Sequence, residues 1–173
     1  MDSNLEDVKI YMMDVTYSSS VDGTGFRDVL FVTGCPHHCP GCHNPETWDR
    51  DKGRAVPAWD VYDMLTKSSV TNITYSGGEP FEQAGALAAL TRCIRARYQK
   101  TFWVYSGYLF EELVADQEKR QLLALCDVLV DGRFEQDKTA LNLRFKGSTN
   151  QRIIDIPASL EAGCAVLYNL DTF

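Results

Sequence analysis

The sequence predicts a single α/β domain, spanning residues 1–173, whose sheet is parallel. Short apolar runs typical of strands alternate with stretches of helical periodicity, and this order favours βαβ units. The five to six expected strands are residues 29–33, 72–75, 102–105 and 128–130, followed by 153–156 and 165–168. A complete eight-stranded β/α barrel needs about 250 residues, so we expect an incomplete (partial) parallel β/α barrel that is open on one side.

Four segments are predicted to be helical. Pro57 suits the first position of a helix that runs to about residue 67. The clearest helix covers residues 81–99, where apolar residues recur at helical spacing at Leu87, Leu90, Ile94 and Tyr98. A further helix is expected over residues 109–125, and a short one after Pro157.

The composition argues against two kinds of partner. The chain has 24 acidic and 17 basic residues and a net charge of −7, whereas nucleic-acid binding depends mainly on Lys and Arg contacts with phosphates. No apolar run approaches the roughly 20 residues of a membrane span. Residues 1–7 are polar and acidic, unlike the start of a signal peptide. We therefore expect a cytoplasmic protein that binds neither nucleic acid nor membrane.

Functional residues of parallel sheets gather on the loops that follow the carboxyl ends of the strands. A cysteine cluster follows the first expected strand, and polar or glycine-rich segments follow the next three, at residues 76–80, 106–108 and 131–133. These four segments are expected to converge on one edge of the sheet.

The cysteine cluster consists of Cys35, Cys39 and Cys42, with the spacing C-x3-C-x2-C. Thiolates suit iron–sulfur clusters and zinc. Three cysteines without a fourth nearby leave one iron of a four-iron cluster open to a small molecule, as in catalytic metal sites. The alternative is a non-enzymatic module, holding either an iron–sulfur cluster or zinc, the latter bound by the three cysteines plus His37, His38 or His43. The remaining cysteines, Cys93, Cys126 and Cys164, are expected to be small buried hydrophobic residues.

The cluster resembles the signature of the radical S-adenosylmethionine superfamily, C-x3-C-x-φ-C, although Gly41 stands where an aromatic residue is usual. The resemblance implies a [4Fe-4S] cluster on Cys35, Cys39 and Cys42, with S-adenosylmethionine (SAM) as second cofactor. It also implies that backbone groups of Gly41, Cys42 and His43 contact the adenine in place of an aromatic side chain.

Further motifs are similar to glycyl-radical-enzyme activating proteins. The segments at residues 21–27 and 42–49 resemble the family in general, whereas those at 103–108, 128–134 and 147–151 resemble the branch acting on anaerobic ribonucleoside-triphosphate reductase. The resemblance covers about residues 21–154. It implies an enzyme that cleaves SAM reductively and generates a glycyl radical on the large reductase subunit, with a low-potential flavodoxin or ferredoxin as electron donor. An activator of a pyruvate formate-lyase-like enzyme is the alternative.

The resemblance also assigns SAM contacts, and none of these side chains is expected to be catalytic beyond the cluster and SAM. Gly77, Gly78 and Glu79 are expected at the methionine amino group, although Gly-Gly also marks turns. Arg133 is a candidate for the methionine carboxylate, or else forms a surface salt bridge. Ser106 is expected at the ribose and Asn150 near the nucleoside, with structural roles in their loops as the alternative. His37 and His38 are interpreted as loop surface.

Overall fold

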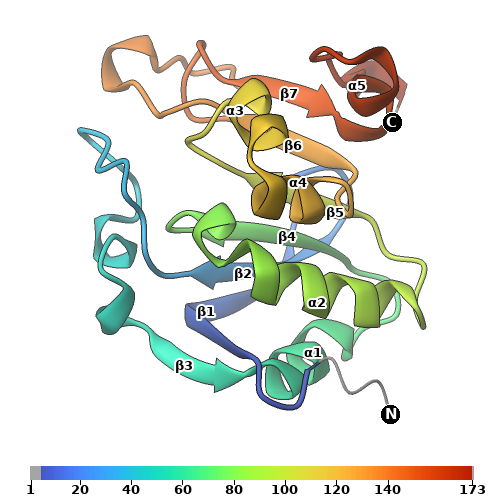
Figure 1. Cartoon of the computed structure of the whole chain (residues 1–173). Helices are drawn as coiled ribbons and strands as arrows, with labels where there is room; N and C mark the ends of the chain where they lie inside the picture. The colour runs from blue at the N-terminus through green and yellow to red at the C-terminus, as the bar shows by residue number, and fades with distance from the viewer. Residues whose placement is uncertain (1–4, 173) are drawn as a thin grey trace.

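The computed structural model describes residues 5–172, which form one seven-stranded sheet with helices packed against it (Figure 1). The strand order is β3-β1-β2-β4-β5-β6-β7. The strands are β1 (Lys9–Ser19), β2 (Arg27–Val32), β3 (Arg54–Pro57), β4 (Asn72–Gly77), β5 (Phe102–Tyr105), β6 (Val128–Asp131) and β7 (Arg152–Asp155).

The sheet is mixed, so the prediction of a wholly parallel sheet is wrong at its edges. The central strands β2, β4, β5 and β6 are parallel, as expected, but β1, β3 and β7 pair antiparallel with their neighbours. Five to six strands were expected and seven are present, because the sequence did not reveal β1 and β3. Residues 165–168 contribute only an isolated bridge between Ile154 and Leu167. The sheet is open, and the curvature of a partial barrel stays a prediction.

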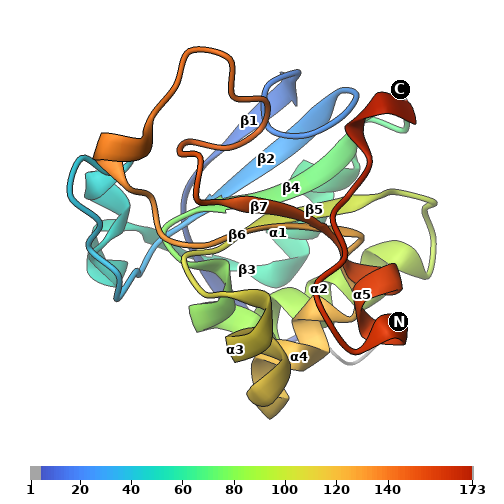
Figure 2. The same ribbon diagram turned by 90° about the horizontal axis from the view of Figure 1, so that it is seen from above.

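Five helices pack on the sheet, and α2, α3 and α4 lie together on one face of it (Figure 2). They are α1 (Ala58–Thr66), α2 (Ala84–Arg95), α3 (Phe110–Ala115), α4 (Gln117–Leu123) and α5 (Ile156–Ala162). The helix expected over residues 109–125 is divided, because Asp116 adopts an extended backbone and its side chain caps α4 by accepting the N–H groups of Glu118 and Lys119. No helix within residues 5–172 is long and apolar enough to cross a membrane.

The main hydrophobic core lies between these helices and the sheet. Leu87, Leu90 and Ile94, which set the helical period of α2, are fully buried in it. Cys93 and Cys126 are buried as predicted, but Cys164 is exposed, so its interpretation as a buried residue is wrong. Burial of the apolar side of α2, together with the hydrogen bond between the Tyr75 and Thr91 hydroxyls, holds this helix against β4.

The start of β2 is held by a buried arginine. The Arg27 side chain is 0% exposed, and its guanidinium donates to Thr74 Oγ1 at 2.7 Å and to the Ile73 carbonyl at 2.7 Å. A Cβ atom at Gly23 would lie 2.7 Å from Arg27 Cδ and 2.8 Å from the indole of Trp103. Gly23 therefore leaves the space that the Arg27 side chain occupies, and the buried guanidinium connects the turn at residues 21–27 to β4.

Candidate functional site

The carboxyl ends of β2, β4, β5 and β6 border a single cavity of about 520 Å³, a size typical of small-molecule sites. The expected convergence of the four loops is confirmed: the cavity is lined by Cys35, Cys39 and Cys42 after β2, Gly77 and Gly78 from the end of β4, Ser106 and Gly107 after β5, and Gly132 after β6. Aromatic side chains supply much of the remaining wall, namely Phe31, Trp48, Tyr105, Phe134 and Phe145.

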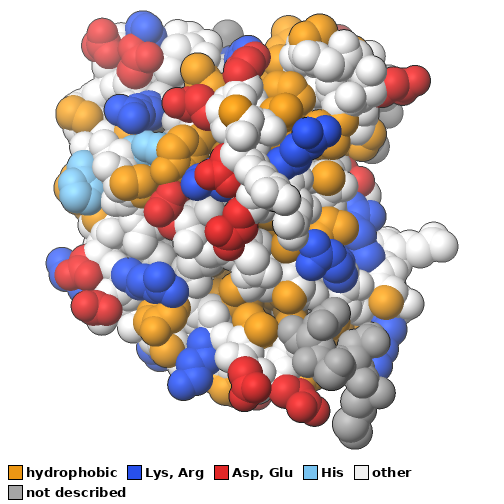
Figure 3. Space-filling model, in the orientation of Figure 1, with side chains coloured by type: hydrophobic (Ala, Val, Ile, Leu, Met, Phe, Trp, Pro, Cys, Tyr) orange, Lys and Arg blue, Asp and Glu red, His pale blue; other side chains and the backbone are white. Residues whose placement is uncertain are grey.

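Backbone hydrogen bonds hold the cysteine loop against the following segment. The Gly34 N–H donates to the Thr47 carbonyl at 2.8 Å, and the Cys35 N–H to the Trp48 carbonyl at 2.9 Å. In Figures 1 and 2 this loop lies beside the segment after β6, and Gly41 approaches Gln136 closely there. Figure 3 shows histidine and hydrophobic side chains on the surface at this edge. The loop is thus an outer wall of the cavity.

The three thiols are half-buried and free of disulfides. Burial raises the pKa of the Cys35 thiol to about 11, although a hydrogen bond from the backbone N–H of His37 acts in the opposite direction. The Asn44 N–H donates to Cys42 Sγ at 3.4 Å. Iron binding displaces thiol protons, and N–H groups directed at sulfur stabilise the thiolate that forms. The donor set and its N–H contacts therefore fit an iron–sulfur cluster.

The end of β4 admits only residues without a side chain at two positions. Gly77 has φ +100°, and a Cβ there would lie 2.5 Å from the Val32 carbonyl oxygen. A Cβ at Gly78 would lie 2.6 Å from the Gly34 carbonyl oxygen. The Gly78 N–H donates to the Val32 carbonyl at 2.8 Å. These close approaches bring the backbone of Gly77 and Gly78 beside the cysteine loop, with both residues facing the cavity.

Five of the residues predicted to bind the cofactor line the cavity: Cys42, His43, Gly77, Gly78 and Ser106. Four others are not among the lining residues: Gly41, Glu79, Arg133 and Asn150. The Arg133 side chain is exposed, and its carbonyl accepts from Asn150 Nδ2 at 2.8 Å. Asn150 Oδ1 is buried with no partner among the described residues, and Asn150 lines a neighbouring cavity instead.

The two histidines of the loop differ. His38 is exposed, as predicted, and stacks on Trp48 with ring centroids 4.8 Å apart. The interpretation of His37 as loop surface is wrong, because its side chain is only 3% exposed and its Nε2 lies 2.9 Å from Glu79 Oε2. No local pattern indicates this contact, since the two residues are 42 positions apart.

Lys146 was missed by the sequence reasoning. It is the one Lys or Arg among the lining residues that the structure describes, and its Nζ donates to the Gln151 carbonyl at 2.9 Å. The available signal was its position directly before the segment at residues 147–151, which already carried a resemblance.

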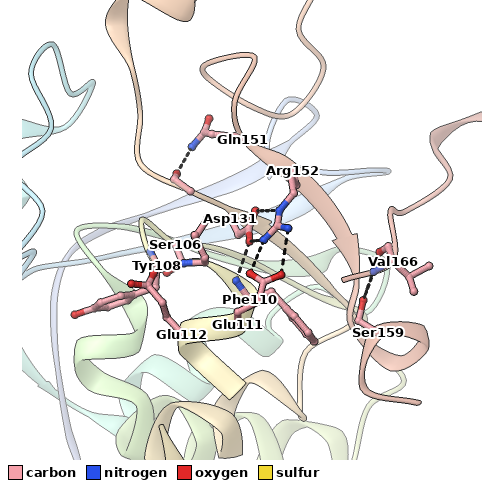
Figure 4. Close-up of polar contacts among 12 residues, drawn as sticks. Ser106, Tyr108, Phe110, Glu111, Glu112, Asp131, Gln151, Arg152, Ser159 and Val166 are labelled. Carbon is pink, nitrogen blue, oxygen red and sulfur yellow. Dashed lines mark hydrogen bonds and ion pairs between the residues drawn. The ribbon is translucent and has the colours of Figure 1, made fainter. Parts of the chain in front are cut away.

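The end of β6 is fixed by an ion-pair network (Figure 4). Asp131 is fully buried, and its Oδ1 accepts from Arg152 Nε at 3.0 Å. Its Oδ2 caps α3 by accepting the Phe110 N–H at 2.8 Å. Arg152 also bonds Glu111 at 2.8 Å, and hydrogen bonds to the two carboxylates raise the pKa of its guanidinium. This network positions the Gly132 turn, which lines the cavity.

The family model of the 4Fe-4S single cluster domain matches residues 21–154, so the chain is a protein of this iron–sulfur class. Three curated relatives are each named anaerobic ribonucleoside-triphosphate reductase-activating protein. That of Pasteurella multocida (strain Pm70) is 36% identical over 84% of this chain and 94% of its own length. That of Enterobacteria phage T4 is 34% identical over 77% and 86%, and that of Escherichia coli (strain K12) 39% over 76% and 89%.

The chain belongs to the family of anaerobic ribonucleoside-triphosphate reductase-activating proteins. The resemblance seen in its motifs is thereby confirmed, and its iron–sulfur character is supported by the matching domain.

Proposed function

We propose that this chain binds a [4Fe-4S] cluster through Cys35, Cys39 and Cys42, cleaves SAM reductively, and thereby generates a glycyl radical on the large subunit of anaerobic ribonucleoside-triphosphate reductase. When bound, the reduced cluster supplies one electron to the sulfonium, which yields methionine and a 5'-deoxyadenosyl radical that takes one hydrogen atom from a glycine Cα. The protein's part is to bind and orient these groups and to exclude water.

One observation carries this proposal. Three thiols with no fourth cysteine among the lining residues share a cavity with the glycine end of β4, in a chain of the 4Fe-4S single cluster class. The matching 4Fe-4S single cluster domain, which covers residues 21–154, favours a multi-iron cluster over the zinc module.

The lining residues suggest how this chain holds SAM. The backbone at Gly77 and Gly78 is proposed to accept hydrogen bonds from the methionine ammonium, since no side chain stands in the way there. Lys146 is proposed to pair with the methionine carboxylate, with Arg133 as the alternative. Asn150 does not line the cavity, but its Oδ1 is a buried acceptor without a partner among the described residues and is proposed to accept from an N–H or O–H of the nucleoside.

The adenine side is proposed to rely on backbone groups of Gly41, Cys42 and His43. Ser106 is proposed as a ribose contact, although its hydroxyl already donates to Glu79. We further propose that the protein acts in the cytoplasm with a low-potential flavodoxin or ferredoxin as donor, and that the open sheet is the incomplete barrel of radical SAM enzymes. An open side leaves room for a glycine-bearing loop of the reductase.

The test is anaerobic reconstitution followed by assay for 5'-deoxyadenosine. The reduced, cluster-loaded chain should convert SAM to 5'-deoxyadenosine, and Cys35→Ala should bind no four-iron cluster. Cys164→Ala, which changes an exposed cysteine distant in sequence from the motif, should retain both properties. A reduced four-iron sample that forms no 5'-deoxyadenosine contradicts the proposal, and one zinc per chain without sulfide identifies the module instead.

A further inference from the structure

Glu79 is engaged within the protein. Its side chain is 1% exposed. Oε1 accepts the Phe81 N–H at 3.0 Å and Oε2 accepts the Gly107 N–H at 2.9 Å. The Ser106 hydroxyl lies 3.0 Å from both oxygens and itself accepts the Tyr108 N–H at 3.0 Å. The carboxylate thus joins the end of β4 to the turn after β5, and it is not among the residues lining the cavity.

The remaining partner of this carboxylate comes from the cysteine loop. His37 lies between Cys35 and Cys39, and its Nε2 is 2.9 Å from Glu79 Oε2. Because both carboxylate oxygens already accept backbone N–H groups, the arrangement suits a His37 tautomer that donates from Nε2. The contact therefore links the loop that bears the three predicted iron ligands to the buried junction of β4 and β5.

The imidazole borders the cavity and is confined on two further sides. Its ring packs edge-on against Tyr108, with centroids 4.5 Å apart. A Cβ atom at Gly107 would lie 2.3 Å from His37 Cδ2, so only glycine leaves space for the ring. A side chain that is hydrogen-bonded at its tip and packed at its edges has one position available, and the backbone at residue 37 is fixed with it.

Apart from the backbone hydrogen bonds of Gly34 and Cys35 to the following segment, the rest of the loop has few other anchors. Pro36, His38 and Pro40 are exposed. His38 adopts φ +46°, a conformation that residues other than glycine rarely adopt, and it is supported by stacking on Trp48. A strained, exposed loop needs support from its surroundings to persist. Its buried side-chain anchor is His37.

We propose that Glu79 and His37 are positioning residues for the iron ligands: the buried carboxylate fixes the imidazole, which sets the positions of Cys35 and Cys39 before iron binds. This inference rests on the proposed function for the identity of the metal group. Glu79 would then support the cysteine loop through His37, in place of the methionine contact that the family resemblance implies. Groups that orient metal ligands typically change metal affinity by about 10–100-fold when removed.

The experiment compares four variants after anaerobic cluster loading without SAM. His37→Phe keeps an aromatic ring beside Tyr108 but removes the hydrogen bond, whereas His37→Gln keeps a donor near the position of Nε2. Glu79→Gln alters the acceptor. Glu82→Gln is the matched control, because Glu82 is an exposed carboxylate three residues further along that bonds only the Tyr108 hydroxyl among the contacts described.

The readouts are the rate of iron loss to a chelator and the electron paramagnetic resonance spectrum of the reduced cluster. His37→Phe and Glu79→Gln should lose iron about tenfold faster than the wild type or more, with altered spectra. His37→Gln should restore the rate to within about threefold, and Glu82→Gln should match the wild type. Circular dichroism of the metal-free variants verifies that they fold; the two His37 variants serve as the test if Glu79→Gln does not fold.

Two results overturn the inference. One is a His37→Phe chain that keeps its iron at the wild-type rate, and the other is a His37→Gln chain that loses iron as fast as His37→Phe. A Glu79→Gln chain with normal iron retention but weakened SAM binding also overturns it and restores the methionine contact. Failure of the proposed function has a different signature, namely a wild-type chain that takes up no four-iron cluster, and that result contradicts both.

Discussion

Replacing Gly77 by alanine should destabilise the protein by a predictable amount, because the structure leaves no space for a methyl group at the end of β4. The new Cβ would lie 2.5 Å from the Val32 carbonyl oxygen and 2.6 Å from the Val32 amide nitrogen. These are backbone atoms of a paired strand, so β2 and β4 must separate. The residue would also keep φ +100°, and a residue with a side chain in a sparsely populated backbone region costs about 1–3 kcal/mol.

Strain and clash together should lower the free energy of unfolding by about 3 kcal/mol. For a domain of this size, each 1 kcal/mol shifts the melting temperature by about 2–4 °C, so a decrease of about 6–12 °C is expected. Urea denaturation of the metal-free chain, followed by circular dichroism, measures the free energy directly. Iron uptake should also fall, because the displaced strand end borders the cysteine loop.

Gly163→Ala is the matched control. Gly163 has φ +72° at the end of α5, and a Cβ there meets nothing within 4 Å. It should therefore show only the conformational cost, about 1 kcal/mol, with normal iron uptake. Equal destabilisation by Gly77→Ala and Gly163→Ala would refute the reasoning, because it would show that the close approach of β2 has no energetic consequence.

Three further predictions concern single side chains. Arg27→Met should lower the free energy of unfolding by about 3 kcal/mol in urea denaturation, since it removes the hydrogen bonds to Thr74 and to backbone carbonyls; an unchanged midpoint contradicts this. Lys146→Gln should weaken SAM binding to the cluster-loaded chain about tenfold in equilibrium dialysis, the loss expected for one charge-assisted contact, while iron content stays normal; unaltered SAM binding would remove Lys146 from the site. Burial raises the pKa of the Tyr75 hydroxyl. The neutral buried hydroxyl therefore contributes fully to stability below the unfolded-state pKa near 10, and this contribution is lost as the pH rises above that value. Tyr75→Phe should accordingly be about 1 kcal/mol less stable than the wild type at pH 7, through loss of the bond to Thr91, and this difference should shrink above about pH 10 in pH-dependent urea denaturation; a constant difference up to pH 11 is the contrary result.

The parallel centre of the sheet could be predicted from the sequence because each of its strands contains a short buried run. β5 and β6 are almost completely buried, so each appears as a short hydrophobic run. The two strands that the sequence did not reveal, β1 and β3, lack that signal. β3 is largely exposed, and the register of β1 shifts between Met12 and Asp14 and again between Thr16 and Ser19. Such irregularities interrupt the alternation of buried and exposed residues by which an antiparallel strand is recognised.

Part of the candidate site can be predicted from local sequence patterns, and part depends on contacts between residues far apart in the chain. The spacing of the three cysteines is a local signal, and the structure brings them to the glycine end of β4. The burial of Glu79 is not local, because its partners Ser106 and His37 are 27 and 42 positions away. Only the pairing of β4 with β5 and the fold of the cysteine loop bring these groups together. Lys146 was missed for a related reason, since the loop that carries it reaches the cavity only in the folded chain.

The measurement that tests the central claim most directly is electron paramagnetic resonance of the reduced, cluster-loaded chain mixed anaerobically with SAM and the large reductase subunit. We predict a doublet from one Cα hydrogen of a glycyl radical, formed together with 5'-deoxyadenosine, that collapses when the reductase contains glycine deuterated at Cα. Cys39→Ala should give neither product. Formation of 5'-deoxyadenosine without any glycine-derived radical on the reductase would contradict the account.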